Sequence, residues 1–257
     1  MDPQTGNWDI WIVDVVRGIP SRVTHDAAQD SDPIWSPDEK SLIFASTRGG
    51  TLALYRKTIG SVQPEEPVYR PERAGMLIPS DWSRDGRFIV FTGLPGAPTT
   101  IWVLPMTTPD AKPFRLPGVE TYAYDARISP DGKWIAYCAF ETGANQIYVQ
   151  RFPEAGAKSQ ITSSGGAHPR WSPDGRELIY WASPRGLAAV TLTLSGDTVR
   201  AGKARTIEGR PIPNLIDART HYDVARDGRM LVRQPIDDTP ASITVFSNWM
   251  KAASARP

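Results

Sequence analysis

The stretch Arg170–Gly175 reads RWSPDG, and four further copies of this pattern recur along the 257-residue chain. The other copies are Ile34–Glu39 (IWSPDE), Asp81–Gly86 (DWSRDG), Arg127–Gly132 (RISPDG) and Asp223–Gly228 (DVARDG). Their aspartates are 47, 46, 43 and 53 residues apart. A period of about 40–50 residues with several strands per unit is typical of the blades of a β-propeller.

The chemistry of the pattern explains why it recurs as a turn. Serine suits the first position of a tight turn, and proline fixes φ for the second. Aspartate can bond to the local backbone, and glycine takes the left-handed conformation that a Cβ disfavours. Glu39 stands where the other four copies have glycine, so the sequence predicts a strained left-handed residue there.

The apolar runs on both sides of each turn predict antiparallel strands. The strands expected after the turns are Ser41–Ala45, Arg87–Phe91, Lys133–Tyr137, Glu177–Trp181 and Arg229–Val232. The expected third strands are Leu52–Lys57, Thr100–Leu104, Gln146–Arg151, Leu187–Leu194 and Ser242–Asn248. More polar fourth strands follow, as at Glu66–Arg70, Lys112–Leu116 and Lys158–Thr162. The predicted class is all-β, a propeller of four-stranded antiparallel blades.

The two ends of the chain do not match the repeat count. Asp9–Val15 and Ser21–Thr24 read as the third and fourth strands of a blade without its first hairpin. We expect one propeller domain over residues 1–250 and a tail at 251–257, the chain beginning inside a blade of a longer propeller. The segments are a partial blade, 1–24, and the repeats 31–70, 79–117, 125–162, 168–209 and 220–249. An open arc is the expected arrangement, and a closed six-bladed ring is the alternative.

Composition excludes several classes of protein. The 29 basic and 28 acidic side chains nearly cancel, which gives no electrostatic case for nucleic acid or an anionic membrane. The longest apolar run, Trp134–Phe140, is far short of the roughly 20 residues that span a bilayer. No signal peptide is evident at the N-terminus.

The single cysteine, Cys138, excludes an intrachain disulfide. Trp35, Trp82 and Trp171 share one repeat position and are expected to pack blade against blade.

One repeated pair of positions predicts a candidate site. The residues three places before the tryptophan position are Asp32, Pro79, Asp125, His168 and His221, and those one place before it are Ile34, Asp81, Arg127, Arg170 and Asp223. In a propeller the innermost strands border a central channel, so equivalent positions converge. We expect a polar ring of Asp32, Asp81, Asp125, Arg127, His168, Arg170, His221 and Asp223. It could hold a protein segment, a peptide or a small polar ligand, or its charges could pair only with each other.

Catalytic motifs are missing from the sequence. There is no Gly-rich phosphate loop, no His-Arg-Asp loop and no Asp-Phe-Gly motif, which a kinase needs to position ATP and magnesium. There is no Gly-x-Ser-x-Gly elbow, and Ser163–Gly166 has the wrong glycine spacing. The histidine and cysteine spacings do not suit zinc, and turn chemistry already accounts for the repeated aspartates. We therefore expect no enzymatic activity, no metal and no cofactor.

The hairpins resemble those of bacterial TolB-like, WD-repeat-like propellers. A closer resemblance rests on Gly6–Trp11 (GNWDIW), Asp32–Asp38 (DPIWSPD), Asp81–Gly86, Tyr148–Pro153 (YVQRFP) and Ser242–Trp249 (SITVFSNW). These segments resemble the C-terminal sensor propeller of membrane-anchored bacterial Ser/Thr protein kinases. That resemblance implies a periplasmic or extracytoplasmic binding module whose kinase domain lies elsewhere.

Two functional classes remain open at this point. The first is a non-catalytic binding or sensor propeller, either of a kinase or of the TolB-like interaction type. The second is the regulatory propeller of a serine peptidase of the prolyl oligopeptidase or tricorn type. Fold analogy does not decide between them.

Overall fold

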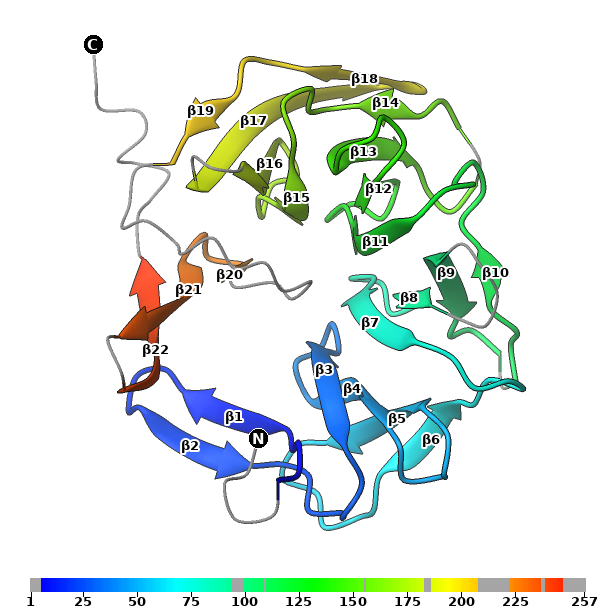
Figure 1. Ribbon diagram of the computed structural model, residues 1–257, viewed down its shortest axis with the longest axis vertical. Coiled ribbons are helices and arrows are strands. Elements are labelled where there is room, and N and C mark those ends of the chain that lie inside the picture. The colour runs from blue at the N-terminus through cyan, green and yellow to red at the C-terminus, as the bar shows by residue number, and fades with distance from the viewer. Residues whose placement is uncertain are drawn as a thin grey trace. The chain divides into compact units, whose positions relative to one another are not determined.

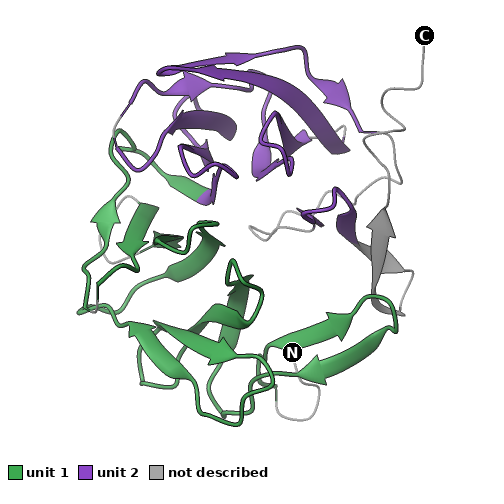
Figure 2. Cartoon of the chain, turned by 180° about the vertical axis from the view of Figure 1, so that it is seen from behind, with its two compact units in different colours: residues 1–124 green, residues 125–257 purple. Residues whose placement is uncertain are grey.

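The computed structural model describes residues 6–93, 99–108, 110–154, 156–182, 186–207, 222–236 and 239–246. Its elements are all β-strands, as Figure 1 shows, and the all-β prediction is confirmed. The chain forms two compact units, residues 1–124 and 125–257, which are coloured separately in Figure 2. We describe each unit by itself.

The N-terminal unit contains one hairpin and two four-stranded antiparallel sheets. The hairpin pairs β1 (Trp11–Asp14) with β2 (Ile19–Arg22). The first sheet has the order β3 (Asp30–Trp35), β4 (Ser41–Ser46), β5 (Ala53–Thr58) and β6 (Glu66–Tyr69). The second has the order β7 (Leu77–Trp82), β8 (Phe88–Gly93), β9 (Thr100–Pro105) and β10 (Phe114–Arg115).

The C-terminal unit repeats the same order of strands. Its first sheet contains β11 (Ala123–Ile128), which crosses the unit boundary, β12 (Trp134–Ala139), β13 (Gln146–Arg151) and β14 (Ser159–Gln160). The next contains β15 (Ala167–Trp171), β16 (Glu177–Ala182), β17 (Gly186–Ser195), β18 (Thr198–Ala201) and β19 (Arg205–Thr206). The last contains β20 (Tyr222–Val224), β21 (Met230–Ile236) and β22 (Thr239–Phe246).

A serine hydroxyl closes four of the five repeated turns. The Ser172 hydroxyl donates to Asp174 Oδ1 at 2.6 Å and accepts from the Glu177 amide at 2.9 Å. The same pair of bonds forms at Ser36, Ser83 and Ser129. The fifth turn has Ala225 in place of serine. It keeps the bond from the Gly228 amide to the Ala225 carbonyl and the Asp227 contact to the Arg229 amide, but the Ala225 amide binds the Arg229 carbonyl, one residue earlier than in the other turns. The turn therefore fixes the hairpin register independently of the apolar side chains around it.

The central strands β4 and β16 are buried on both faces, because a hydrophobic core lies on each side of these strands. On β4, Leu42 and Phe44 pack with Ile10, which directly precedes β1, while Ile43 and Ala45 pack with the sheet that begins at β7. This is the period of two expected of a strand. In the C-terminal unit, one core joins sheet β11–β14 to sheet β15–β19, and another joins β16 and β17 to β20 and β21.

The predicted packing role of the repeat tryptophans holds for two of the three. Trp171 is buried, and its indole N–H donates to the Arg127 carbonyl of the neighbouring sheet at 2.9 Å. Trp82 packs against the core shared by sheets β3–β6 and β7–β10. Trp35 is 45% exposed, so the expected burial is wrong for this residue.

The strand predictions are close except in the fourth repeat. Gln146–Arg151 is found as predicted, and the other central strands shift by one or a few residues. The expected third strand Leu187–Leu194 is part of the longer β17, which continues into a hairpin with β18 that the sequence interpretation missed. Asn248 and the tail 251–257 lie outside the described residues. The single domain, and the choice between arc and ring, stay predictions.

Glu39 has the left-handed conformation predicted for it, with φ of 60°, and its counterpart Gly175 has φ of 71°. We predict that Glu39→Gly raises the free energy of unfolding by up to about 1 kcal/mol. Relief of the left-handed strain contributes roughly 1–2 kcal/mol, and the greater freedom of glycine in the unfolded chain offsets about half of it. Chemical denaturation of the two proteins measures the difference.

Lys40→Gly is the matched control, because Lys40 is the next residue of the same turn and does not have positive φ. It gains only unfolded-chain entropy and should be less stable than the wild type. A Glu39→Gly protein that unfolds as easily as Lys40→Gly would contradict the strain argument.

Candidate functional site

The first strands of several sheets carry an irregularity at the predicted site positions. Asp32, Asp125 and His168 have φ of 53°, 48° and 56°, a region where aspartate and histidine are enriched among non-glycine residues. The pairing of β3 with β4 and of β15 with β16 shifts register at Asp32-Pro33 and at His168-Pro169. Proline cannot donate to the ladder and is tolerated at such bulges, which redirect the neighbouring side chain.

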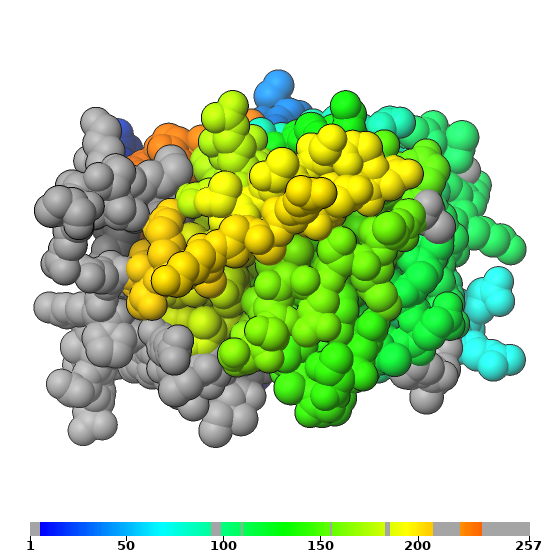
Figure 3. All heavy atoms as spheres, turned by 90° about the horizontal axis from the view of Figure 1, so that it is seen from above, coloured from blue at the N-terminus to red at the C-terminus, as the bar shows by residue number. Residues whose placement is uncertain are grey.

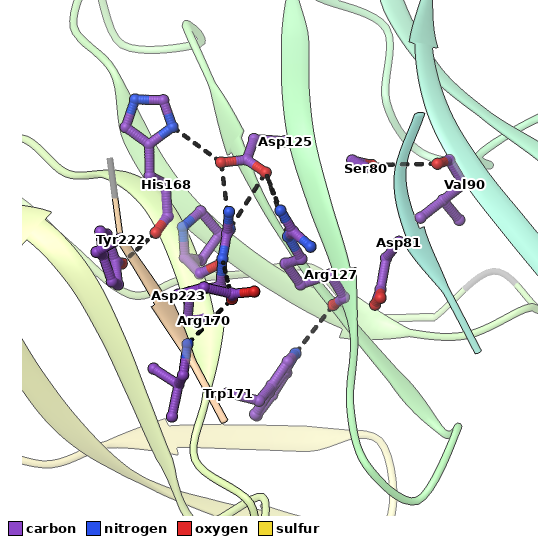
Figure 4. Close-up of polar contacts among 12 residues, drawn as sticks. Ser80, Asp81, Val90, Asp125, Arg127, His168, Arg170, Trp171, Tyr222 and Asp223 are labelled. Carbon is purple, nitrogen blue, oxygen red and sulfur yellow. Dashed lines mark hydrogen bonds and ion pairs between the residues drawn. The ribbon is translucent and has the colours of Figure 1, made fainter. Parts of the chain in front are cut away.

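In the C-terminal unit these redirected side chains meet in a cluster that we call the first-strand network: Asp125, Arg127, His168, Arg170 and Asp223 (Figure 4). Asp125 lies at its centre. Its Oδ2 is 2.8 Å from His168 Nδ1, its Oδ1 is 3.2 Å from Arg127 Nη2, and Arg170 Nη1 contacts both oxygens at 3.2 and 3.3 Å. The opposite side of Arg170 binds Asp223, with Nε 3.1 Å from Oδ1.

The interior of the network is buried and ionised. Burial by itself raises the pKa of Asp125, but the charges of Arg170 and Arg127 and the hydrogen bond from His168 hold that pKa well below its usual range. Burial alone would lower the pKa of Arg170, but Asp125 and Asp223 raise it. A buried charge is tolerated when it is paired and hydrogen-bonded, and each of these groups has several partners.

The network is exposed at one end. The Asp223 side chain is 66% exposed, compared with 5% for Arg170 and 10% for Asp125. Asp223 Oδ1 also accepts from the Val224 amide at 3.0 Å, which fixes the carboxylate at the start of β20. An approaching ligand would therefore meet Asp223 first, with the guanidinium of Arg170 directly behind it.

Tyr222 supports the network and was missed by the sequence interpretation. It is buried, its hydroxyl bonds the His168 carbonyl and lies 3.2 Å from the Ile179 carbonyl, and the Arg170 guanidinium lies 5.7 Å from its ring centroid. Burial raises the pKa of Tyr222, so its hydroxyl remains a donor. A signal was available: the residues equivalent to Tyr222 in the other copies are small or proline, namely Pro33, Ser80, Ala126 and Pro169.

The structure accounts for the other predicted ring residues separately. Asp32 and Asp81 belong to the N-terminal unit, where Asp32 sits at the bulge of β3 and Asp81 Oδ1 accepts from the Trp82 amide at 2.9 Å. Ile34 of the same set is buried. His221 lies outside the described residues. Five of the eight predicted polar residues therefore form one network, and the complete ring stays a prediction.

The chemistry of the network favours recognition over catalysis. A carboxylate with a lowered pKa is a poor proton acceptor, and arginine does not release its proton at neutral pH. The pairing of His168 with Asp125 has the geometry of a His–carboxylate dyad, but Arg127 and Arg170 occupy the same carboxylate. Within the described residues, no three His, Cys, Asp or Glu side chains are grouped so that they could hold a metal ion. The described part of the chain also contains no helix with the length and hydropathy needed to cross a membrane.

We predict that Asp125→Asn lowers the free energy of unfolding by roughly 3–5 kcal/mol, because it leaves the buried Arg170 without its central anion. Asp32→Asn is the matched control: it makes the same change at the same repeat position with the same left-handed backbone, and no ion pair is found for Asp32 among the described residues. Asparagine tolerates this conformation, so the control should unfold close to the wild type. Equal destabilisation by the two changes would refute the central role of Asp125.

The lowered pKa of Asp125 also predicts how stability depends on pH. A carboxyl whose pKa falls on folding stabilises the folded state above its unfolded-chain pKa of about 3.9, and this contribution is lost as pH falls through the folded-state pKa. The wild type should therefore lose more stability than Asp125→Asn below about pH 4. Denaturant titrations of both proteins from neutral to acid pH measure the two slopes. If the stabilities of the two proteins fall equally as pH decreases below about 4, the lowered pKa does not belong to Asp125.

Comparison with known proteins identifies the fold. No family model matches the chain. A curated relative, the "Uncharacterized peptidase YuxL" of Bacillus subtilis (strain 168), is 28% identical over 186 residues, which is 71% of this chain. The chain spans only 26% of the length of that relative.

Two solved structures match nearly the whole chain. TolB from Acinetobacter baumannii aligns with a TM-score of 0.70 and 20% identity, over 93% of this chain and 57% of that one. The putative TolB from Agrobacterium tumefaciens aligns with a TM-score of 0.66 and 19% identity, over 94% of this chain and 85% of that one. At this level of identity the likeness concerns the fold, and the chain has the fold of a TolB-like β-propeller with antiparallel four-stranded blades.

Proposed function

We propose that this chain is a non-catalytic binding module and that its first-strand network contacts a protein or peptide ligand. The observation that carries the proposal is the convergence of β11, β15 and β20 on one set of charged side chains with an exposed end at Asp223. Arginine and aspartate held in fixed positions bind polar groups of a ligand without having to be ordered first. A small polar ligand would use the same contacts.

Backbone strain in the network supports a functional role. Asp125 and His168 both adopt left-handed φ within strands, a conformation that costs on the order of 1–3 kcal/mol at a non-glycine residue. Asp32 has the same conformation at the equivalent position of β3, where no ion pair is found for it among the described residues, so the charged partners and not the strain alone distinguish the network. The strain aims both side chains into one cluster, and such outliers concentrate at functional sites.

The finer proposal is a sensor propeller of a bacterial Ser/Thr protein kinase or a TolB-like interaction module. The kinase version is supported by the sequence resemblance at Gly6–Trp11 and Ser242–Trp249, and it carries an extracytoplasmic location with it. The TolB-like version is supported by the shared fold. In both versions the chain supplies recognition and any catalytic domain lies elsewhere.

A regulatory propeller of a serine peptidase is the second candidate. It is favoured by the 28% identity to a Bacillus protein named as a peptidase, of which this chain would correspond to about one quarter. The sequence encoded upstream and downstream of this chain in the same reading frame separates the two candidates. A kinase domain and a membrane span encoded upstream would support the first, and an α/β-hydrolase domain encoded downstream would support the second.

We predict that the purified chain hydrolyses neither ATP nor ester or peptide substrates, because the sequence lacks the nucleophile elbow and the phosphate-binding motifs. Steady-state assays with ATP, nitrophenyl esters and fluorogenic peptides measure this. Turnover that a single substitution in this chain abolishes would overturn the non-catalytic assignment. Turnover that survives every such substitution would be assigned to a contaminant.

Peptides selected from a displayed random library on the wild-type chain should include a class that depends on the network. We predict that this class binds Asp223→Ala about tenfold or more weakly, as expected when a charge-assisted hydrogen bond is lost. Asp227→Ala is the control, because Asp227 is a comparably exposed aspartate near β20, pairs with Arg229 and lies outside the network. Titration calorimetry with synthetic peptides measures both affinities. If every selected peptide binds Asp223→Ala and the wild type equally, the network is not the binding site.

A further inference from the structure

The fourth repeat contains a hairpin that the other sheets of the structure do not share within their described residues. β17 has 10 residues, while β5, β9 and β13 have 6 each. The first half of β17 pairs with β16 and β19, and its second half, Leu192–Ser195, pairs with β18. Insertions into single units of a repeat protein often build its binding face. This hairpin is therefore a candidate element of a second binding site.

The hairpin is firmly attached to the neighbouring sheet. Leu192 and Val199 are buried in the core that also contains Trp134 and Ile147 of sheet β11–β14. At its tip, Asp197 Oδ1 pairs with Arg151 Nε at 3.3 Å. Figure 3 shows the β17–β18 segment, in yellow, crossing over the green sheet. The hairpin thus forms a fixed wall that needs no ordering when a ligand arrives.

A groove of about 420 Å³ lies beside this wall. Pro130, Leu192 and Leu194 supply its apolar lining, and Asp131, Asp174 and Arg176 supply its charged lining. The two turns that carry these aspartates are packed closely, since a Cβ added at Gly175 would lie 3.4 Å from Pro130 Cδ. The volume is within the range of about 300–1,000 Å³ that ligand sites occupy.

The two aspartates of the groove differ from their counterparts in the second and fifth turns and resemble Asp38 of the first turn, for which the described residues likewise provide bonds to Oδ1 only. In the second and fifth turns the arginine two places on, Arg87 or Arg229, binds Oδ2 of the turn aspartate at 2.6 Å. Asp131 and Asp174 use Oδ1 for the serine hydroxyl and the backbone amide, and no bond among the described residues uses their Oδ2.

Arg176 is the equivalent arginine of the fourth turn, and only its backbone amide binds Asp174. The hydrogen bond from the Ser172 hydroxyl lowers the pKa of Asp174, so this carboxylate is charged at neutral pH. The charged lining of the groove therefore consists of the carboxylates of Asp131 and Asp174 and the guanidinium of Arg176.

We propose that this groove binds an arginine side chain of a partner polypeptide. The methylene stem would lie on Pro130 and Leu194, and the guanidinium would reach Asp131 and Asp174. Arginine fits better than a compact ammonium because its planar fork matches carboxylates in two directions, while its stem buries readily on apolar surface. The site is separate from the first-strand network and does not depend on the function proposed for it.

The test uses the full chain and the peptide acetyl-Ala-Leu-Arg-Leu-Ala-amide, with citrulline in place of arginine as the neutral, isosteric control. Titration monitored by calorimetry or NMR should show the arginine peptide binding about tenfold or more tightly than the citrulline peptide. The double variant Asp131→Asn/Asp174→Asn should lose this preference, because asparagine keeps an acceptor oxygen for the turn and removes the charge. Leu194→Ala should weaken both peptides, because it removes apolar contact area shared by them.

The matched control is Asp38→Asn/Asp85→Asn, which makes the same change in two turns of the N-terminal unit outside the groove. It should bind like the wild type, as should Asp223→Ala, whose result separates this site from the first-strand network. Equal affinity for the two peptides, no binding of either, or equal loss in the control double variant would each overturn the proposal.

Discussion

The hydrogen bonds of the turn serine are the interaction on which the rest of the sheet depends in four of the five repeats. In the fourth repeat one hydroxyl joins the Asp174 carboxylate to the Glu177 amide, so the first two strands can leave the turn in a single register. A slip of one residue would move every side chain of β16 to the opposite face. Because both faces are buried against different sheets, the turn decides which core each side chain enters.

The same register decides where charge gathers. Once the turn is closed, the residue before the tryptophan position and the residue two places earlier are fixed relative to the next sheet. In the C-terminal unit this brings Arg170 between Asp125 and Asp223. The left-handed backbone at Asp125 is then the local cost of directing a carboxylate at two guanidinium groups. Buried ion pairs contribute little net stability and instead penalise every arrangement in which one partner is missing.

Sequence reasoning reached the features that depend on local chemistry. Turn residues and period-two apolar runs predicted the central strands, including Gln146–Arg151 to the residue, and the missing glycine predicted the strained Glu39. It also selected the repeat positions that supply the network. Which of them share a carboxylate could not be read from the sequence, because Asp125 meets partners up to 45 residues away along the chain.

Two misses had different causes. The β17–β18 hairpin was hidden because Thr191–Leu194 continues the alternation of β17 without a break, so the pattern reads as one strand that simply ends. The exposure of Trp35 depends on what covers the first full sheet, and that neighbour is set by tertiary packing and not by the turn. Residue propensity and the apolar pattern predict that a segment is a strand, whereas the burial of its side chains depends on which element packs against it.

The repeated turns can contribute to binding surfaces because each turn uses only one carboxylate oxygen of its aspartate. One carboxylate oxygen closes the turn, and the second is free to take a partner chosen by the surroundings. Arg87 and Arg229 take that oxygen in two turns, and at Asp174 the corresponding arginine instead lines a groove beside an inserted hairpin. The turn therefore fixes the partners of one oxygen of each repeated carboxylate, while the partner of the other oxygen differs from turn to turn. A propeller can acquire a charged site in this way, by changing one neighbour of a repeated turn and keeping the hydrogen bonds that hold the blade.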